Sequence, residues 1–367
     1  MQNNKYILFA GPYPPPIHGQ SYAFKMAYDH FKEPKILISQ NLESSNKLVR
    51  TARALRSIIN YFLIFNKYDI SVVYLTGSRS VLGSLKDVIL IRLAKFKNAR
   101  IINHIHAAHF NKFLESLPSY LKKLYYTSYK KVDVFVPLLL EMVHEYKEFE
   151  KSARIEVVEN FYDPGMNLLQ VPIKSHQSSD SIVISYFSNL IFSKGIFDLL
   201  DAFLLLQKKF PAVLLQIAGN YGSDSFMSAE EVKLKFQPYL ENKSIEYCGV
   251  LQRDAKIKFL TRSHIFILPS FYTSEAFPIS ILEAMRCGNA IIVSDHHYLP
   301  GIVGKEGGSI VEARNINAIS DSIETMLEHP EELKTIRSHN VKFASSHYSL
   351  DKYINKLYSI IQHTSKF

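Results

Sequence analysis

The sequence of 367 residues has few cysteines and no long apolar run. Its two cysteines, Cys248 and Cys287, lie in apolar patterns, so we expect two buried free thiols and no disulfide framework. The longest uncharged apolar stretch, from Val134 to Leu140, is far shorter than the roughly 18 residues needed to cross a bilayer. The N-terminal apolar stretch is too short for the core of a signal peptide. These absences predict a cytoplasmic protein without a transmembrane helix.

The charge of the chain is unevenly distributed. Residues 1–163 hold 23 Lys and Arg against 14 Asp and Glu, whereas residues 164–367 hold 20 of each. The whole excess of +9 therefore lies in the first half. A basic half indicates an anionic partner, namely nucleic acid, an acidic membrane surface or a phosphorylated substrate, or else a basic face that only contacts solvent.

Short β-rich stretches alternate with helical patterns along the whole chain, which predicts an α/β fold with parallel sheets. In the first half the predicted strands are Tyr6–Ala10, Ile36–Ile38, Ile70–Leu75, Arg100–Ile105, Val132–Val136 and Ile155–Val158. In the second half they are Ile182–Phe187, Val213–Ala218, Ser244–Cys248, His264–Leu268, Ala290–Ser294 and Ser309–Val311.

This pattern restarts once, and a chain of this length is too long for one hydrophobic core, so we expect two facing Rossmann-like domains. The first covers residues 1–163 and the second residues 181–345. Residues 164–180 carry Pro, Gly and Ser without an apolar period, which is typical of a linker. Residues 346–367 form a C-terminal amphipathic helix that must pack against another element.

The segment after the strand His264–Leu268 carries two carboxylates. Pro278 suits the first position of a helix, and ligands of open α/β sheets gather at strand ends and helix N-termini. The amides from Phe277 to Ser280 are therefore expected to face a phosphate. Glu275 precedes the helix, and Glu283 lies about 7 to 8 Å further along its axis. Such carboxylates accept hydrogen bonds from sugar and ribose hydroxyls, although by spacing alone they are equally well interpreted as surface acids.

This segment resembles the donor-binding region of retaining glycosyltransferases of family 4, which have the GT-B fold. Their signature of Glu, seven residues and Glu is matched by Glu275 and Glu283. The resemblance implies that Glu275 contacts the transferred sugar and Glu283 the ribose. It also implies that the intervening backbone approaches the donor through Ala276, Phe277, Pro278 and Ile279. Ala276 stands where the family usually has Gly.

The loop after the strand that ends at Phe187 carries the next matching residues. The family places an Arg and a Lys-Gly pair here to neutralise the donor diphosphate. Lys194 and Gly195 match the pair, whereas Asn189, which follows Ser188, stands in place of Arg. Without the resemblance, Lys194 would be interpreted as a surface lysine. The resemblance further assigns the base pocket to the turns at Gly219 and at Gly249 and Val250, although glycine after a strand is more often just a turn.

In the first half, the Pro-rich turn from Gly11 to Gly19 is similar to the family's opening loop, where Gly19 would let the backbone approach the diphosphate. His104 and His106 are expected to share a strand face. No Asp, Glu or Cys beside them completes a metal site, so no metal is expected. The resemblance implies that a His faces the sugar, with His106 the first candidate and His104 the second. It also implies that the terminal helix returns to the first domain.

Two basic amphipathic stretches, Lys47–Phe65 and Tyr120–Lys131, remain outside this resemblance. In the first, Lys47, Arg50, Arg53 and Arg56 are predicted on one side and Leu48, Leu55, Ile58, Ile59 and Phe62 on the other. Such helices either rest on anionic lipid or cover a core with a solvated basic face. In the first case the acceptor would be a lipid-linked saccharide.

Together these features predict a retaining glycosyltransferase that moves a sugar from a nucleotide-diphosphate sugar to a saccharide acceptor. No cofactor is required. Its expected context is surface polysaccharide synthesis (capsule, O-antigen or lipopolysaccharide) on the inner face of the cytoplasmic membrane. An epimerase of the same fold is the nearest alternative. A nucleic-acid-binding protein would explain the basic half but not Glu275, Glu283 or Lys194. A dinucleotide oxidoreductase is not favoured, because no Gly-x-Gly-x-x-Gly motif follows any predicted strand of this sequence.

Overall fold

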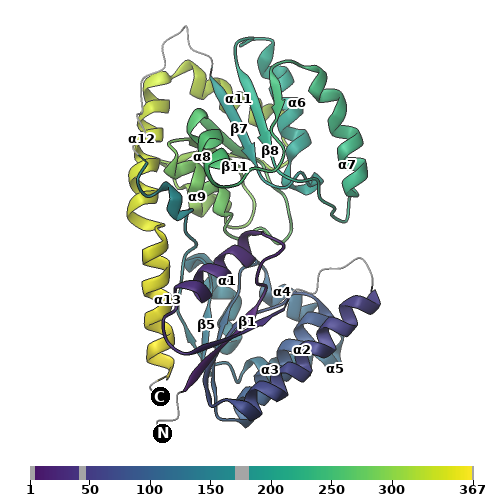
Figure 1. Cartoon of the computed structure of the whole chain (residues 1–367). Coiled ribbons are helices and arrows are strands. Elements are labelled where there is room, and N and C mark those ends of the chain that lie inside the picture. The colour runs from purple at the N-terminus through teal and green to yellow at the C-terminus, as the bar shows by residue number, and fades with distance from the viewer. Residues whose placement is uncertain (1–4, 41–46, 170–181, 366–367) are drawn as a thin grey trace. The chain divides into compact units, whose positions relative to one another are not determined.

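The computed structural model describes residues 5–40, 47–169 and 182–365, with the side chain of Lys47 left out. The chain forms two compact units. Unit 1 comprises Met1–Asn160 and Asp351–Phe367, and unit 2 comprises Phe161–Leu350. Each unit holds one parallel sheet of six strands, so the predicted α/β class is confirmed (Figure 1). Most of the predicted linker, 164–180, lies outside the described residues, and its start forms the short 3₁₀ helix η2 (Pro164–Met166).

The sheet of unit 1 has the strand order β2-β1-β3-β4-β5-β6. Its strands are β1 (Tyr6–Gly11), β2 (Lys35–Ser39), β3 (Ile70–Thr76), β4 (Arg100–His104), β5 (Val134–Val136) and β6 (Arg154–Ile155). Its helices are α1 (Gly19–His30), α2 (Lys47–Lys67), α3 (Val81–Phe96), α4 (Phe110–Glu115), α5 (Ser119–Tyr129), η1 (Leu140–Phe149) and α13 (Leu350–Ser365), which begins at the last residue of unit 2.

Both faces of this sheet are covered, which explains why β1 and β3 are almost continuously apolar. Val73, Leu75 and Ile101 join a core that includes residues of α2, α3 and α5. On the opposite face, Phe9 contacts the aromatic rings of Phe24 and Tyr74.

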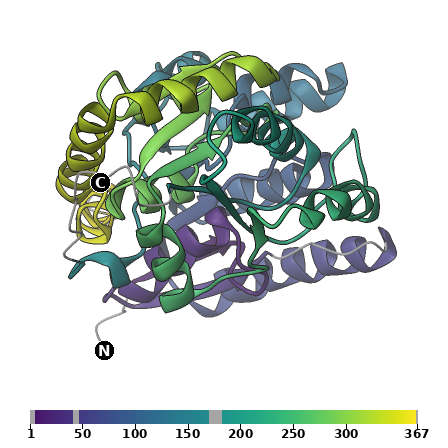
Figure 2. The same cartoon turned by 90° about the horizontal axis from the view of Figure 1, so that it is seen from above.

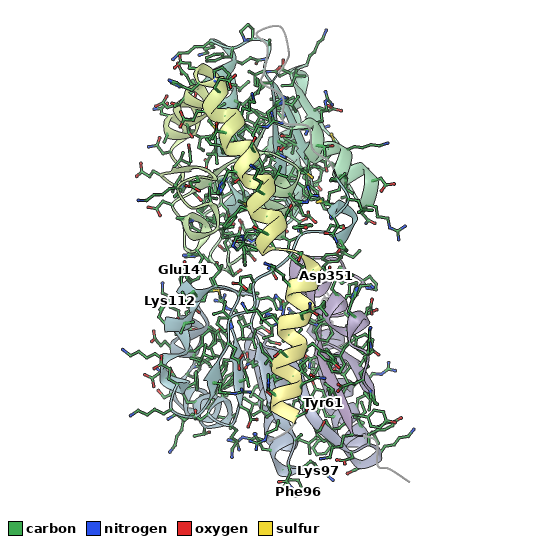
Figure 3. All side chains as sticks on the ribbon, turned by 90° about the vertical axis from the view of Figure 1, so that its left-hand side faces the viewer. Tyr61, Phe96, Lys97, Lys112, Glu141 and Asp351 are labelled. Atoms are coloured by element: carbon green, nitrogen blue, oxygen red, sulfur yellow. The ribbon has the colours of Figure 1, made fainter. Side chains whose placement is uncertain are left out.

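Helix α13 completes unit 1. Tyr353 Oη donates to the carbonyl of Ala23 over 3.3 Å, and Tyr358 Oη donates to Glu33 Oε1 over 2.8 Å. Figure 3 shows Asp351 at the start of the part of α13 that belongs to this unit. The last helix of the chain therefore packs on the unit formed by the first 160 residues.

The sheet of unit 2 has the strand order β12-β11-β10-β7-β8-β9. Its strands are β7 (Val183–Phe187), β8 (Leu214–Ala218), β9 (Ile245–Tyr247), β10 (Ile265–Leu268), β11 (Ala290–Ser294) and β12 (Gly308–Val311). Its helices are η3 (Phe192–Lys194), α6 (Ile196–Gln207), α7 (Ala229–Phe236), η4 (Gln237–Glu241), α8 (Arg253–Arg262), α9 (Ile279–Arg286), α10 (Leu299–Val303), α11 (Ile316–Glu328) and α12 (Pro330–His347).

The order of strands reverses at one point in each sheet. In unit 1 the reversal lies between β1 and β3, and in unit 2 between β7 and β10. Open parallel sheets bind ligands at the carboxyl ends of the strands beside such a switch point. The two switch points therefore mark where functional side chains are to be sought in each unit.

All the predicted strands are present, with some corrections at their ends. Strand β6 ends at Ile155, although the amide of Val158 still bonds the carbonyl of Pro137 beyond it. Both cysteines are free, as predicted, but Cys248 is only half-buried because the edge strand β9 ends just before it. Among the described residues no helix is long and apolar enough to cross a membrane.

The core side of α2 is formed by Ala54, Ser57, Tyr61 and Phe65, which are all buried. The predicted apolar side, for which lipid and core were both left open, is largely a different one. Of its members, Ile58 packs against the core, whereas Leu48, Leu55, Ile59 and Phe62 are exposed. On this core side, the buried hydroxyl of Tyr61 accepts a hydrogen bond from Gln40 Nε2 over 2.6 Å.

Candidate functional site

The switch point of unit 2 lies between two loops that contact each other. One follows β7 and contains Lys194 and Gly195, and the other follows β10 and runs from Pro269 to Pro278. The amide of Phe271 donates to the carbonyl of Ser193 over 2.7 Å. Gly195 has φ = 76°, and a Cβ atom there would lie 2.1 Å from the carbonyl oxygen of Pro269. Only glycine allows this close approach of the two loops.

A largely buried ion pair joins these loops. Lys194 Nζ lies 2.5 Å from Glu275 Oε2, and the two side chains are 14% and 7% exposed. Ser270 Oγ donates to the same carboxylate oxygen over 2.8 Å, and the Lys194 ammonium lies 4.9 Å from the ring centre of Tyr272. A buried charge is tolerated when it is paired and hydrogen-bonded, as both charges are here. The structure thus brings together Lys194 and Glu275, which lie 81 positions apart in sequence.

Helix α9 begins directly after this pair. Pro278 precedes its first residue, Ile279, and fixes the backbone entering the helix. The first amides of a helix have no carbonyl partner within it, and they carry the positive end of the helix dipole. Ala276 and Phe277, between the carboxylate and the helix, are buried. The donor-binding residues predicted from Ala276 to Ile279 therefore form the N-terminal approach to α9.

Glu283 lies within α9 and makes a second buried ion pair. Its Oε1 accepts a hydrogen bond from Lys256 Nζ over 2.6 Å, and the same ammonium donates to Asp163 Oδ2 over 2.9 Å. Burial raises the pKa of Glu283. Burial opposes the Lys256 charge, but Glu283 and Asp163 outweigh it, so the Lys256 pKa is raised. Lys256 was not predicted, because no pattern separates it from Lys258, which is exposed on the same helix.

The two turns predicted to bind the base of the nucleotide donor also contact each other. The amide of Gly219, after β8, donates to the carbonyl of Gly249 over 2.9 Å. A Cβ atom on Gly219 would lie 1.8 Å from the carbonyl oxygen of Ser188. The backbone carbonyl of Asn189 accepts a hydrogen bond from Tyr186 Oη. Val250 is exposed. Backbone contacts therefore connect Ser188, Gly219 and Gly249 at the carboxyl ends of neighbouring strands.

In unit 1, polar side chains gather near the switch point between β1 and β3. Gly19 is the first residue of α1, whose N-terminus is capped by His18 and Ser21. Thr76 at the end of β3 pairs in register with His104 at the end of β4. The rings of His104 and His106 lie 4.1 Å apart, and His104 Nδ1 lies 2.7 Å from Tyr74 Oη.

Several polar atoms of this group are buried without a partner. Among the described residues nothing bonds Thr76 Oγ1, His104 Nε2 or either ring nitrogen of His106. Burial lowers the pKa of His106 to about 3, with a smaller effect of His18, and it lowers the pKa of His104 well below its usual value. Both rings are therefore neutral near pH 7. Neutral imidazole both donates and accepts, which suits hydroxyl groups of a ligand.

These buried histidines predict an acid-sensitive unit 1. Their folded pKa lies below the unfolded value of 6.5, so the unfolded chain binds protons that the folded chain does not. Stability is therefore expected to fall as the pH drops from about 6.5, by up to about 1.4 kcal/mol per pH unit for each histidine. Urea unfolding measured between about pH 7 and pH 5 tests this expectation. The unfolding free energy of His104→Gln should fall less steeply with decreasing pH than that of the original protein. Equal slopes would contradict the assignment of His104 as neutral in the folded state.

Sequence reasoning missed Ser270, Tyr272 and Thr76. Ser270 and Thr76 follow or end apolar strands, so their position at a carboxyl strand end was a usable signal. No sequence signal distinguishes Tyr272, since its place under Lys194 depends on the contact between two loops. Within residues 5–40, 47–169 and 182–365, no three His, Cys, Asp or Glu side chains cluster as metal ligands.

The sequence is similar to known proteins over part of its length. Residues 172–342 match the family "Glycosyl transferases group 1". A Campylobacter jejuni enzyme, N,N'-diacetylbacillosaminyl-diphospho-undecaprenol alpha-1,3-N-acetylgalactosaminyltransferase, is 28% identical over 147 residues, which is 40% of this chain and 35% of that enzyme. The chain therefore spans about a third of the length of this relative. The family match, between residues 172 and 342, indicates a transferase enzyme and includes Lys194, Glu275 and Glu283.

Solved structures show the fold over the whole chain. Sucrose-phosphate synthase from Thermosynechococcus elongatus has a TM-score of 0.75 at 13% identity, covering 98% of both chains. Anabaena HepE in complex with UDP has a TM-score of 0.67 at 14% identity, covering 98% of this chain and 100% of that chain. The chain therefore has the GT-B fold shared by these glycosyltransferases, as predicted.

Proposed function

We propose that this chain is a retaining glycosyltransferase that moves a sugar from a nucleotide-diphosphate sugar to a saccharide acceptor. The observation that carries the proposal is the buried Lys194–Glu275 pair at the switch point of unit 2, directly before the N-terminus of α9. A cation and helix amides suit a diphosphate, and a carboxylate suits sugar hydroxyls. The match to the glycosyltransferase family covers this same region.

In the proposed reaction, the bond between the anomeric carbon and the diphosphate oxygen breaks, and a bond to the acceptor oxygen forms on the same face of the sugar. The departing diphosphate takes the proton of the acceptor hydroxyl. Lys194 and the first amides of α9 stabilise the negative charge that develops on the leaving group. No cofactor is needed in this scheme, and no protein nucleophile takes part.

Glu275 has a second role in the proposal. Its Oε2 already accepts from Lys194 and Ser270. Its Oε1 is then left for hydroxyls of the transferred sugar. Lys194 would shift toward the diphosphate, because the phosphate oxygens offer a stronger negative charge.

The remaining donor contacts follow from the other residues of unit 2. Glu283 would bind the ribose with the oxygen that does not accept from Lys256. The turns at Gly219, Gly249 and Val250 would hold the base through backbone groups, with Gly195, Ser188 and Asn189 beside the phosphates. From unit 1, Gly19 would approach the diphosphate, and neutral His106 would bond the sugar.

We propose a lipid-linked saccharide as the acceptor, in surface polysaccharide synthesis on the inner face of the cytoplasmic membrane. The printed name of the Campylobacter relative describes a transferase acting on an undecaprenol-linked sugar. The basic excess of residues 1–163 suits the diphosphate of such an acceptor and the membrane that holds it.

A ligand screen tests the donor class. Among UDP-, GDP- and dTDP-sugars, a UDP-sugar is expected to raise the melting temperature by several degrees, because a ligand that binds only the folded state stabilises it. UDP is the first candidate because HepE, which shares the fold, binds it. Donor consumption without any acceptor would favour the epimerase. A salt-sensitive shift with RNA and none with nucleotide sugars would refute the transferase proposal.

A further inference from the structure

Helix α2 (Lys47–Lys67) has two apolar sides. Its core side, with Tyr61 and Phe65, is buried in unit 1. Its other side carries an exposed apolar ridge, defined by five residues that lie within about 100° of the helix circumference. These ridge residues are between 49% and 80% exposed, and they are Leu48, Leu55, Ile59, Phe62 and Leu63. Figure 1 and Figure 2 both show α2 at the periphery of unit 1.

The ridge is unusual because the helix already has a core side. Surface helices normally present polar residues opposite their core face. Here the position opposite the core is occupied by Leu55 and Ile59 instead. Singly exposed apolar residues need no explanation, but a contiguous row of large ones marks an interaction surface.

The charges of α2 indicate what the ridge contacts. The helix contains no Asp or Glu, and its basic residues are Lys47, Arg50, Arg53, Arg56 and Lys67. Arg56 and Lys67 are exposed and lie within about 50° of Leu63 around the helix. An apolar ridge with basic residues along its border matches the interface of an anionic lipid surface, where apolar side chains enter the acyl boundary and cations meet headgroups.

The second basic amphipathic stretch does not share this property. In α5 (Ser119–Tyr129), Tyr125 and Tyr129 are fully buried, and Tyr120 is the large exposed apolar residue. Their burial makes α5 a core helix with a basic solvent face, the second of the two possibilities predicted for this stretch. Of the two basic stretches, α2 is therefore the one that supports the membrane interpretation.

We propose that unit 1 docks on an anionic membrane through the exposed ridge of α2, with the helix lying in the plane of the interface. A second copy of the chain is a poorer occupant. Ridge-to-ridge pairing of two α2 helices would bring together two helices whose own charged residues are all basic. The proposal concerns binding and does not depend on which sugar is transferred, or on transfer at all.

Vesicle cosedimentation of the full-length protein tests the proposal. The protein is expected to bind vesicles that contain phosphatidylglycerol and to bind phosphatidylcholine vesicles much less, with the difference shrinking at high salt. The double variant Leu55→Glu/Ile59→Glu should bind the anionic vesicles at least about tenfold more weakly, since two carboxylates would enter the interface. Arg56→Gln should weaken binding by about fivefold, because each basic residue near the surface contributes about 1 kcal/mol.

A matched control separates docking from general effects of the substitution. Leu234 in α7 is 62% exposed, as large as the ridge residues, and lies in unit 2. Leu234→Glu should bind vesicles like the unmodified protein. Thermal unfolding and circular dichroism establish that every variant is folded.

Three results would overturn the proposal. The first is no binding of the unmodified protein to anionic vesicles. The second is equal binding by a folded Leu55→Glu/Ile59→Glu variant. The third is a dimer in light scattering that this double variant dissociates, without any vesicle binding, which would assign the ridge to a second copy. None of these depends on the donor screen, so the two proposals fail independently.

Discussion

Glu275→Gln is expected to lower the rate of sugar transfer by about 10²- to 10³-fold, the range seen when one preorganised electrostatic contact of an active site is removed. The amide keeps the size of the side chain and still accepts from Ser270 Oγ. It carries no negative charge for sugar hydroxyls or for Lys194. The loss should appear mainly in kcat, because the interaction strengthens as charge develops on the sugar. Initial rates at varied donor concentration measure this split.

Lys194→Met should cause a loss of similar size, because the diphosphate then departs without its cation. Each single substitution also leaves one buried charge without its partner, which costs about 3 kcal/mol of unfolding free energy. The double variant Lys194→Met/Glu275→Gln removes both charges. It should regain most of the stability in urea unfolding while staying as inactive as the single variants.

This pattern separates a functional pair from a structural one. A structural pair would lose activity only through unfolding, so activity would return with stability in the double variant. The exposed pair of Arg262 and Glu246 is the matched control. Arg262→Met should leave both stability and activity nearly unchanged, because surface ion pairs contribute little. Full activity in Glu275→Gln or Lys194→Met would refute the site.

Gly195→Ala is expected to destabilise unit 2 by about 3 kcal/mol or more. A left-handed conformation costs a non-glycine residue roughly 1 to 2 kcal/mol. The added Cβ would also meet the carbonyl oxygen of Pro269 at 2.1 Å, so the loop that carries Ser270 and Glu275 must move. Because displacing catalytic groups by about 1 Å costs about 10²-fold in rate, kcat/KM should fall by that order.

Gly304→Ala is the control for this substitution. Gly304 also has a positive φ, 63°, but nothing lies within 4 Å of the added Cβ. Its ψ of −165° belongs to a region that is essentially restricted to glycine, so the conformational cost alone should lower the unfolding free energy by about 1 to 3 kcal/mol. The transfer rate should not change, because no neighbouring loop must move. Kinetics of the two variants side by side measure the effect of the contact with Pro269 on the site. An equal loss of transfer rate in both variants would mean that the loop contact does not organise the site.

Local patterns in the sequence predicted the strands well. Runs such as Val72–Leu75 and Ile265–Leu268 are apolar on both faces because helices cover both sides of each sheet, and this signal survives in any context. The ends of the strands were less predictable. Ile155 ends β6 at the sheet edge, where pairing with a single neighbour decides how far the ladder continues.

The helix faces show the limit of such patterns. In α2 both sides are apolar, so periodicity alone could not tell which side is buried. The buried side is the one that packs on distant parts of the chain, as the hydrogen bond between Gln40 and Tyr61, 21 positions apart in sequence, illustrates.

The candidate site divides in the same way. The apolar strands, the Lys194-Gly195 pair and the spacing of Glu275 and Glu283 are local features, so the sequence alone determined the α/β class and singled out the segment for which donor binding is proposed. Only the tertiary structure decided that Lys194 pairs with Glu275, that Ser270 supports the pair and that Lys256 holds Glu283. These contacts join loops and helices 5 to 81 positions apart. The Lys194–Glu275 contact depends on the strand order, which places β7 beside β10, and no local pattern encodes that order.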